Sequence, residues 1–263
     1  MGLFFAEDEE RFTGVRKTGF PRYREVLEGS WKDFLKVGFI TLLFYIPLAG
    51  GVVYAVLSRS LLVAVLSGVI GGAVAGPGFA CLVDLILRRL RDDLGDWWTV
   101  WKRAFKQNFR ASLYPGALQN ALFALLVYGF ALMLWGAIRF SPATVVFFLL
   151  AALLVCMLMT VWWPQVVLFR QTSVLQQKNA LLFVLMHPWK TLRSALLQLA
   201  WWAVMFLFLP WTAFVVPFLG LWFILYVALF LLYPDLDDAF RIEEQISGQL
   251  SARTEDMEDI END

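Results

Sequence analysis

The stretch FSPATVVFFLLAALLVCMLMTVWWPQVVLF, residues 140–169, contains no Asp, Glu, Lys or Arg. A transmembrane helix needs about 20 consecutive apolar residues, and this run exceeds that length. Two further uncharged runs cover residues 111–138 and 194–234. Hydrophobic residues make up 60% of the chain, and a soluble fold of this length has too little core to hide such runs. The sequence therefore predicts an integral membrane protein.

These runs are apolar on every side, whereas the strands of a membrane β-barrel alternate apolar and polar residues. We therefore expect an all-α polytopic protein, a bundle of six transmembrane helices. The run 194–234 would form one helix about 60 Å long, twice the hydrocarbon thickness, so it is expected to fold back near Pro210 and Pro217. The expected helices lie at about residues 37–57, 61–87, 112–136, 143–168, 193–209 and 213–233.

The same boundaries define a cytoplasmic segment at 1–36, a transmembrane domain at 37–234 and an acidic tail at 235–263 that we expect to be disordered. Of the 22 Lys and Arg residues, all except Arg59 and Arg139 fall on one side of the membrane in this arrangement. Because Lys and Arg accumulate in cytoplasmic loops, both termini are expected in the cytoplasm.

The second expected helix contains GVIGGAVAGPG, residues 68–78. This stretch lacks the Lys-Ser/Thr end of a phosphate-binding P-loop and its strand-to-helix context. It does form a seam of small residues at every fourth position, where another helix can approach closely. The seam consists of Gly68, Gly72, Gly76 and Ala80. The expected neighbour is the first helix, with Gly50 and Gly51, and the alternative is a second copy of the chain or a foreign helix.

An amphipathic pattern follows at 96–110, DWWTVWKRAFKQNFR, with Asp96 as the expected N-cap. Aromatic residues recur on one helix face and basic residues on the other, as in helices that lie at a membrane interface beside anionic lipid. This helix either only orients the connection or docks a cytoplasmic partner; nucleic acid is not an expected partner. The residues concerned are Trp97, Trp98, Trp101, Lys102, Arg103, Phe105, Lys106 and Arg110.

Few ionisable or polar side chains lie within the expected membrane-spanning helices. Asp84 is the one acidic residue inside an expected helix, and Arg88 lies one turn later, so the two can form a local ion pair or belong to a conducting or substrate site. The amides Gln119, Asn120, Gln165 and Gln198 are expected to hydrogen-bond between helices. The chain has one histidine, His187, and lacks the GxSxG, HExxH and Walker A patterns. We predict no catalytic residue, no cofactor and no metal site.

Four motifs occur in a characteristic order between residues 30 and 235: FYIPLAGG, GGAVAGPGFACLVDLILRRLRDD, WWTVWKRAFKQNFRASL and QKNALLFVLMHPWKTL. This order resembles the YesL-like bacterial membrane proteins, a family of unknown molecular function. The resemblance implies a bacterial cytoplasmic membrane protein with an accessory role in carbohydrate uptake by ATP-binding-cassette systems. The chain departs from the commoner form of the family in a longer region between the first two helices and in its acidic tail.

Two functional hypotheses follow. The first is a non-enzymatic accessory or assembly factor that contacts the lipid bilayer and binds a membrane-protein partner or a second copy of itself. The alternative is a permease-like transporter of a small, sugar-like molecule. Transporters bind substrate where helices are broken near the membrane midplane, and Gly50, Gly51, Pro47 and Pro77 are candidates for such breaks.

Overall fold

The computed structural model describes residues 17–93, 95–139, 141–169, 171–208 and 211–245. It divides into two units, Met1–Trp31 and Lys32–Asp263. The described part of the first unit contains the start of helix α1 (Phe20–Ser58), which therefore begins well before the span expected from residue 37. The helix begins early because Arg22–Glu25 and Arg24–Glu28 form ion pairs one turn apart, which stabilise a polar helical segment.

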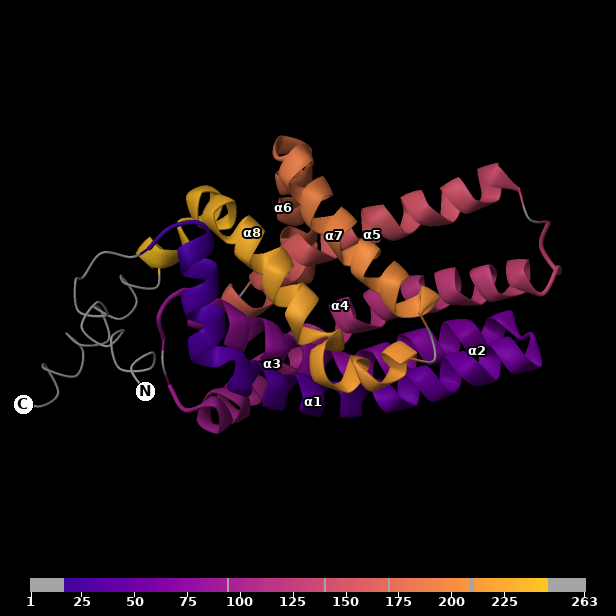
Figure 1. Cartoon of the computed structure of the whole chain (residues 1–263), viewed down its shortest axis with the longest axis horizontal. Coiled ribbons are helices and arrows are strands. Elements are labelled where there is room, and N and C mark those ends of the chain that lie inside the picture. The colour runs from indigo at the N-terminus through magenta and orange to yellow at the C-terminus, as the bar shows by residue number, and fades with distance from the viewer. Residues whose placement is uncertain (1–16, 94, 140, 170, 209–210, 246–263) are drawn as a thin grey trace, which may run out of the picture. The chain divides into compact units, whose positions relative to one another are not determined.

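The second unit is helical throughout its described residues (Figure 1). After α1 come α2 (Leu61–Leu66), the π-helical turn η2 (Ser67–Gly71), α3 (Gly72–Leu90), α4 (Trp97–Leu134), α5 (Pro142–Leu168), α6 (Ser173–Met186) and α7 (Pro188–Leu207). The chain then forms the short helices η3 (Trp211–Phe214) and η4 (Val216–Gly220), and ends its described course with α8 (Trp222–Phe240). Side chains at the helix starts accept backbone hydrogen bonds: Ser60 caps α2, Asp96 caps α4 and Ser141 caps α5.

Among the described residues, five helices are long and apolar enough to cross a membrane: Phe20–Ser58, Leu61–Leu90, Trp97–Leu134, Pro142–Leu168 and Val216–Phe240. The chain is therefore an all-α protein of the multi-pass membrane type. The remaining expected span corresponds to α7. Its uncharged part, 194–207, is about 21 Å long, shorter than the ~30 Å hydrocarbon core, because Lys190 and Arg193 lie in its first turns.

Helix α3 lies at the centre of the second unit and packs against α4, α5 and α8. The side chains from Ala80 to Leu87 are all buried. By contrast, many large apolar side chains on other helices point outward, as expected of a surface that faces lipid. Examples are Ile46, Leu62, Phe147, Leu150 and Leu154.

The glycine seam packs against α4, so the prediction that α1 would be its neighbour is wrong. A Cβ atom on Gly68 would lie 2.5 Å from Cα of Ala121, and one on Gly72 would lie 2.5 Å from the carbonyl oxygen of Gly116. One on Gly76 would lie 2.4 Å from the carbonyl oxygen of Ser112. Ala80, which continues the seam, is fully buried. The small residues thus let the backbones of two antiparallel helices touch.

Helix α1 contacts the opposite side of the same segment. A Cβ on Gly71 would meet Leu48 of α1 at 2.7 Å, and one on Gly51 would meet the Ser67 hydroxyl, whereas Gly50 has no neighbour within 4 Å. The hydroxyl of Thr41 in α1 donates to the carbonyl oxygen of Gly78 at 3.0 Å. The π-helical turn at Ser67–Gly71 allows both helix contacts, because its wider turn presents Gly68 to α4 and Gly71 to α1.

The prolines Pro47 and Pro77 do not break their helices, which continue through both positions, and α1 also continues through Gly50 and Gly51. The interruptions lie elsewhere, at the π-helical turn η2 and at the short helices η3 and η4 between α7 and α8. The prediction that these prolines mark helix breaks is therefore wrong.

Two other expected boundaries change. The amphipathic segment 96–110 and the third span 112–136 form one helix, α4, because no helix-breaking residue separates them. Likewise α8 continues to Phe240, so residues 235–240 are helical: Asp235 pairs with Lys190 of α7, and Leu236 is fully buried. Residues 246–263 of the predicted disordered tail lie outside the described residues.

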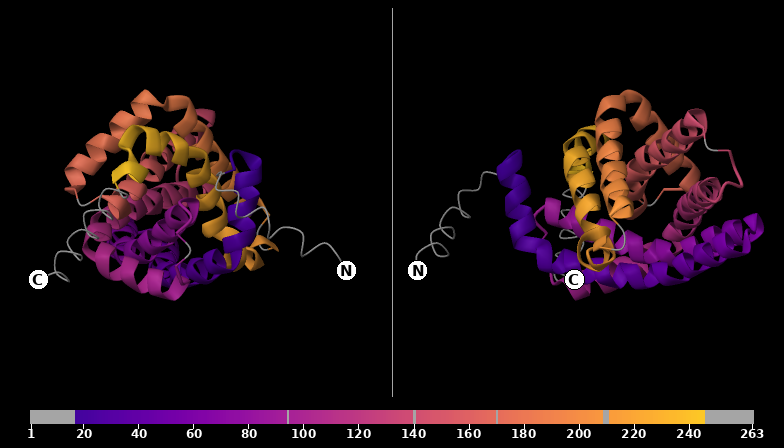
Figure 2. Two further views of the ribbon diagram at one scale, coloured as in Figure 1. Left: turned by 90° about the vertical axis from the view of Figure 1, so that its left-hand side faces the viewer. Right: turned by 45° about the vertical axis from the view of Figure 1, so that its right-hand side comes forward.

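The α1–α2, α3–α4 and α4–α5 connections lie at two opposite ends of the second unit (Figures 1 and 2). The turn between α1 and α2, with Arg59, lies at the same end as the α4–α5 connection, with Arg139. The α3–α4 connection lies at the other end, together with the basic residues that flank it.

Candidate functional site

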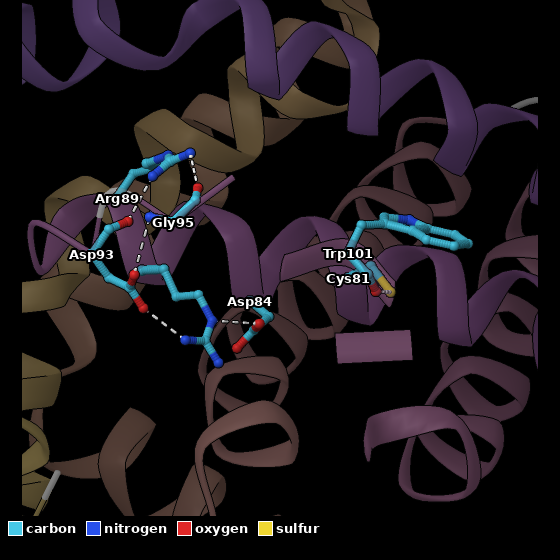
Figure 3. A network of polar contacts seen from close by, with 7 residues as sticks. Cys81, Asp84, Arg89, Asp93, Gly95 and Trp101 are labelled. Atoms are coloured by element: carbon cyan, nitrogen blue, oxygen red, sulfur yellow. Dashed lines mark hydrogen bonds and ion pairs between the residues drawn. The ribbon is translucent and has the colours of Figure 1, made fainter. Parts of the chain in front are cut away.

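A cluster of ion pairs lies at the C-terminal end of α3. The Nε of Arg88 donates to Asp84 at 2.8 Å, and its Nη1 donates to Asp93 at 2.7 Å. The next residue, Arg89, donates to Asp33 of α1 and to the carbonyl oxygens of Asp93 and Gly95. Figure 3 shows Asp84 and Asp93 on either side of one guanidinium. The cluster ties α1 to α3 and holds the α3–α4 connection in place.

Partial burial would raise the pKa of Asp93, but the hydrogen bonds from Arg88 and from the backbone N–H of Gly95 outweigh it and lower that pKa. Asp96, the fully exposed N-cap of α4, also has a lowered pKa, chiefly because it accepts from the N–H of Thr99. Both carboxylates are therefore held ionised. The cluster therefore has a structural role, in which the carboxylate of Asp84 pairs with the guanidinium of Arg88.

The aromatic residues at the start of α4 form a ladder of rings. The rings of Trp98 and Trp101 stack at 5.2 Å, and those of Trp101 and Phe105 at 5.1 Å. The Lys36 ammonium lies 5.0 Å from the centre of the Trp97 ring. The buried face of this segment is a different one, made of the small or polar residues Val100, Ala104, Asn108 and Ser112. The sequence pattern located the aromatic face, but the helix packs on α3 through the small face beside it.

The ladder leaves part of its surface uncovered. Trp98 and Phe109 are each 42% exposed, and Lys102 lies 5.5 Å from the centre of the Trp98 ring. The remaining basic residues of the pattern, Arg103, Lys106 and Arg110, are exposed.

A cavity of about 660 Å³ lies among α4, α5, α7 and α8, within the 300–1,000 Å³ range of small-molecule sites. Tyr45 of α1 and Phe79 of α3 also line it. Its lining includes no Asp, Glu, Lys, Arg or His among the described residues, so the ion-pair cluster, Asp84 included, does not contribute. Along α5 the lining residues extend from Val145 to Trp163, a distance of about 27 Å. The cavity is therefore long and almost entirely apolar.

Polar side chains gather at one end of this cavity. The indole N–H of Trp163 in α5 donates to the side-chain oxygen of Gln119 in α4. One turn away on α5, the Thr160 hydroxyl accepts from the amide of Gln198 in α7 at 2.8 Å. Asn120, next to Gln119, donates to the carbonyl oxygen of Gly116 at 2.9 Å. Helices α4 and α7 thus bring amide groups to the level of Thr160 and Trp163 of α5, and we call this region the polar end.

The polar end retains unused hydrogen-bonding groups. Within the described part of the chain, Gln119 uses its amide oxygen, and its amide nitrogen has no partner. In the same described part, Gln198 uses its amide nitrogen and its amide oxygen has no partner, whereas Asn120 hydrogen-bonds both Gly116 and the Tyr45 side chain. Each of these residues lines the cavity. Unpaired amide groups are costly at membrane depth unless a ligand or water binds them.

Comparison with models of known protein families, with curated proteins and with solved structures finds no match for this chain. The resemblance to the YesL-like family therefore stays a prediction.

The amides named from the sequence behave in different ways. Gln119, Gln198 and Asn120 do hydrogen-bond between helices, as predicted, Asn120 with Tyr45 of α1. Gln165 instead donates to a carbonyl oxygen of its own helix. Sequence analysis did not predict a cavity. The one signal that pointed to it was the presence of amides in three otherwise apolar segments.

For metals, the described residues contain no group of three or more His, Cys, Asp or Glu side chains that could hold an ion.

Proposed function

We propose that this protein is permease-like and takes an amphipathic small molecule from the bilayer into the cavity among α4, α5, α7 and α8. The observation that carries the proposal is the shape and polarity of the cavity, which is long and apolar with hydrogen-bonding groups at one end. Small-molecule sites of membrane proteins commonly lie between helices and combine apolar walls with a few convergent polar groups.

The proposed arrangement has six crossings with both termini in the cytoplasm, in a bacterial cytoplasmic membrane. It is supported by the distribution of basic residues, since Arg59 and Arg139 lie at one end of the second unit and the α3–α4 connection at the other. Helix α7 serves as the sixth crossing in this arrangement. Its first turns carry Lys190 and Arg193, whose long side chains can reach the membrane surface.

Filling the cavity tests the proposal. Ala152 lines the cavity at the middle of α5, so Ala152→Phe is expected to block it. Ala151 lies between the exposed residues Phe147 and Leu154 on the other face of α5, which makes Ala151→Phe a matched control. In native mass spectrometry of protein purified in mild detergent, wild type and the control should carry a bound molecule that Ala152→Phe lacks. Equal retention by all three proteins would contradict the proposal.

A second candidate function is that of an accessory or assembly factor for another membrane complex, such as a carbohydrate uptake system of the ATP-binding-cassette type. It is favoured by the exposed ladder at the start of α4, where Trp98 and Phe109 lie beside basic residues. Cross-linking in cells followed by affinity purification should recover a defined membrane partner from wild type and less of it from Trp98→Ala. Recovery of the chain alone from both would count against this role.

A further inference from the structure

The polar end of the cavity offers a specific set of hydrogen-bonding groups. Among the described residues, its free donor is the amide nitrogen of Gln119, and its free acceptor is the amide oxygen of Gln198. Asn120 is already engaged with the carbonyl oxygen of Gly116 and with the Tyr45 hydroxyl. Trp163 is held in the wall of the cavity by two contacts: its indole N–H donates to Gln119, and its ring lies edge-to-face with that of Phe79, with the ring centres 4.9 Å apart. A bound polar group must therefore both donate and accept hydrogen bonds in a fixed place.

The cavity excludes a charged head group. Its described lining contains no Asp, Glu, Lys, Arg or His, so neither a phosphate nor an ammonium would find an opposite charge there. An uncompensated ion at membrane depth is strongly unfavourable. The ligand is therefore uncharged at its polar group.

The rest of the cavity matches a chain. From the polar end, lining residues continue along α4 from Phe123 to Phe130, while α5 runs antiparallel beside it from Trp163 back to Val145. Helix α7 contributes Trp202 and Phe206 to the same apolar part. This length and apolarity suit a hydrocarbon tail.

From these features we propose that the cavity binds an uncharged lipid alcohol, with its hydroxyl group at the polar end and its hydrocarbon chain between α4, α5, α7 and α8. A hydroxyl is the smallest uncharged group that donates one hydrogen bond and accepts others, as the free acceptor of Gln198 and the free donor of Gln119 require. The inference rests on the proposed function and names its ligand class.

Three photoactivatable probes test the head group. They share one long alkyl chain with a diazirine and differ only in their end: a hydroxyl, a methyl ether or a carboxylate. The full-length protein is reconstituted in phosphatidylcholine vesicles, irradiated, and the labelled residues are mapped by mass spectrometry. The alcohol should label the cavity-lining residues of α4 and α5 about tenfold more than the ether or the carboxylate, as the loss of one or two hydrogen bonds predicts.

Two variants add a second readout. Gln198→Leu removes a free acceptor at the polar end and should lower labelling by the alcohol several-fold without affecting the ether. Gln107→Leu, at an exposed position of α4 outside the cavity, should match wild type. If Gln198→Leu does not fold, the comparison of the three probes on wild type still decides.

The outcomes separate the two proposals. Strong labelling of the cavity by the alcohol alone supports the inference. Equal labelling of the cavity by all three probes overturns the lipid alcohol and leaves the proposed function standing. Absence of cavity labelling above that of the outward-facing residues overturns both.

Discussion

Single glycines set the distance between α3 and α4. Gly72 and Gly116 face each other so closely that a Cβ on either would lie within 2.6 Å of the carbonyl oxygen of the other. Because backbone atoms cannot move aside as side chains do, even one methyl group must push the helices apart. The Gly72 position therefore controls how closely the two helices pack.

Gly72→Ala should destabilise the protein by about 1–3 kcal/mol, as overpacking does in tight interiors. Gly50→Ala is the control, because Gly50 also lies in a helix and has no neighbour within 4 Å. That substitution should be neutral or stabilising by up to about 1 kcal/mol, since Ala favours a helix over Gly. Thermal unfolding in detergent measures both, and equal midpoints for the two variants would contradict the close packing described here.

At this scale the sequence predicts a helix face better than it predicts the neighbour of that face. The four-residue spacing of Gly68, Gly72 and Gly76 is visible in the chain, and these residues do make a close helix contact. The neighbour could have been inferred from Ser112, Gly116 and Asn120, which repeat the same spacing in α4. This second seam is interrupted by larger residues, so it is hard to recognise until the two helices are seen together.

At the scale of an element, α4 combines two roles in one helix. Its first turns carry the aromatic ladder and the exposed basic residues, and its later turns carry Gln119 and the lining of the cavity. The two regions are therefore coupled through one continuous helix, which contains Pro115 between them. Two separate helices, as the sequence suggested, would not be coupled in this way.

A proline at Ala111 distinguishes one helix from two. In a continuous helix, Ala111→Pro removes a backbone hydrogen bond and clashes with the carbonyl of residue 107, at a cost of about 3 kcal/mol or more. At the start of a separate helix the same proline would be tolerated. Ala111 is exposed, so Ala111→Ser serves as a control with little expected effect. Retention of the wild-type unfolding temperature by Ala111→Pro would show that α4 is divided.

The extent of α4 was hard to predict because the amphipathic segment and the membrane span have different hydrophobic patterns. A change of pattern suggests a boundary, yet no glycine or proline stands between Asn108 and Leu113 to make one. The uncharged runs, in contrast, predicted the existence of the apolar helices well. Length and apolarity alone define a span, whereas the ends of a helix depend on caps and on packing.

At the scale of the whole chain, the number of crossings depends on α7. The α7–α8 connection contains Trp211, which is 80% exposed. With six crossings it lies outside the cell together with Arg139. With five it lies inside, and the chain after α8 lies outside.

Cysteine labelling in intact cells decides between these arrangements. Arg139→Cys and Trp211→Cys should react with a membrane-impermeant maleimide, while Gln107→Cys should react only after permeabilisation. The native residues Cys81 and Cys156 are buried and should give little background. Protection of Trp211→Cys in intact cells would remove α7 from the crossings, and labelling of Gln107→Cys would invert the proposed orientation.

The close pair formed by α3 and α4 also implies an order of assembly. The two helices are consecutive and joined by a connection that the ion-pair cluster fixes, so they can associate as a hairpin as soon as both have been synthesised. The cavity needs α5, α7 and α8 in addition, up to Leu229. A nascent chain that ends before α8 therefore already has its stable hairpin but lacks one wall of the cavity, and the ligand can be retained only once α8 has been added.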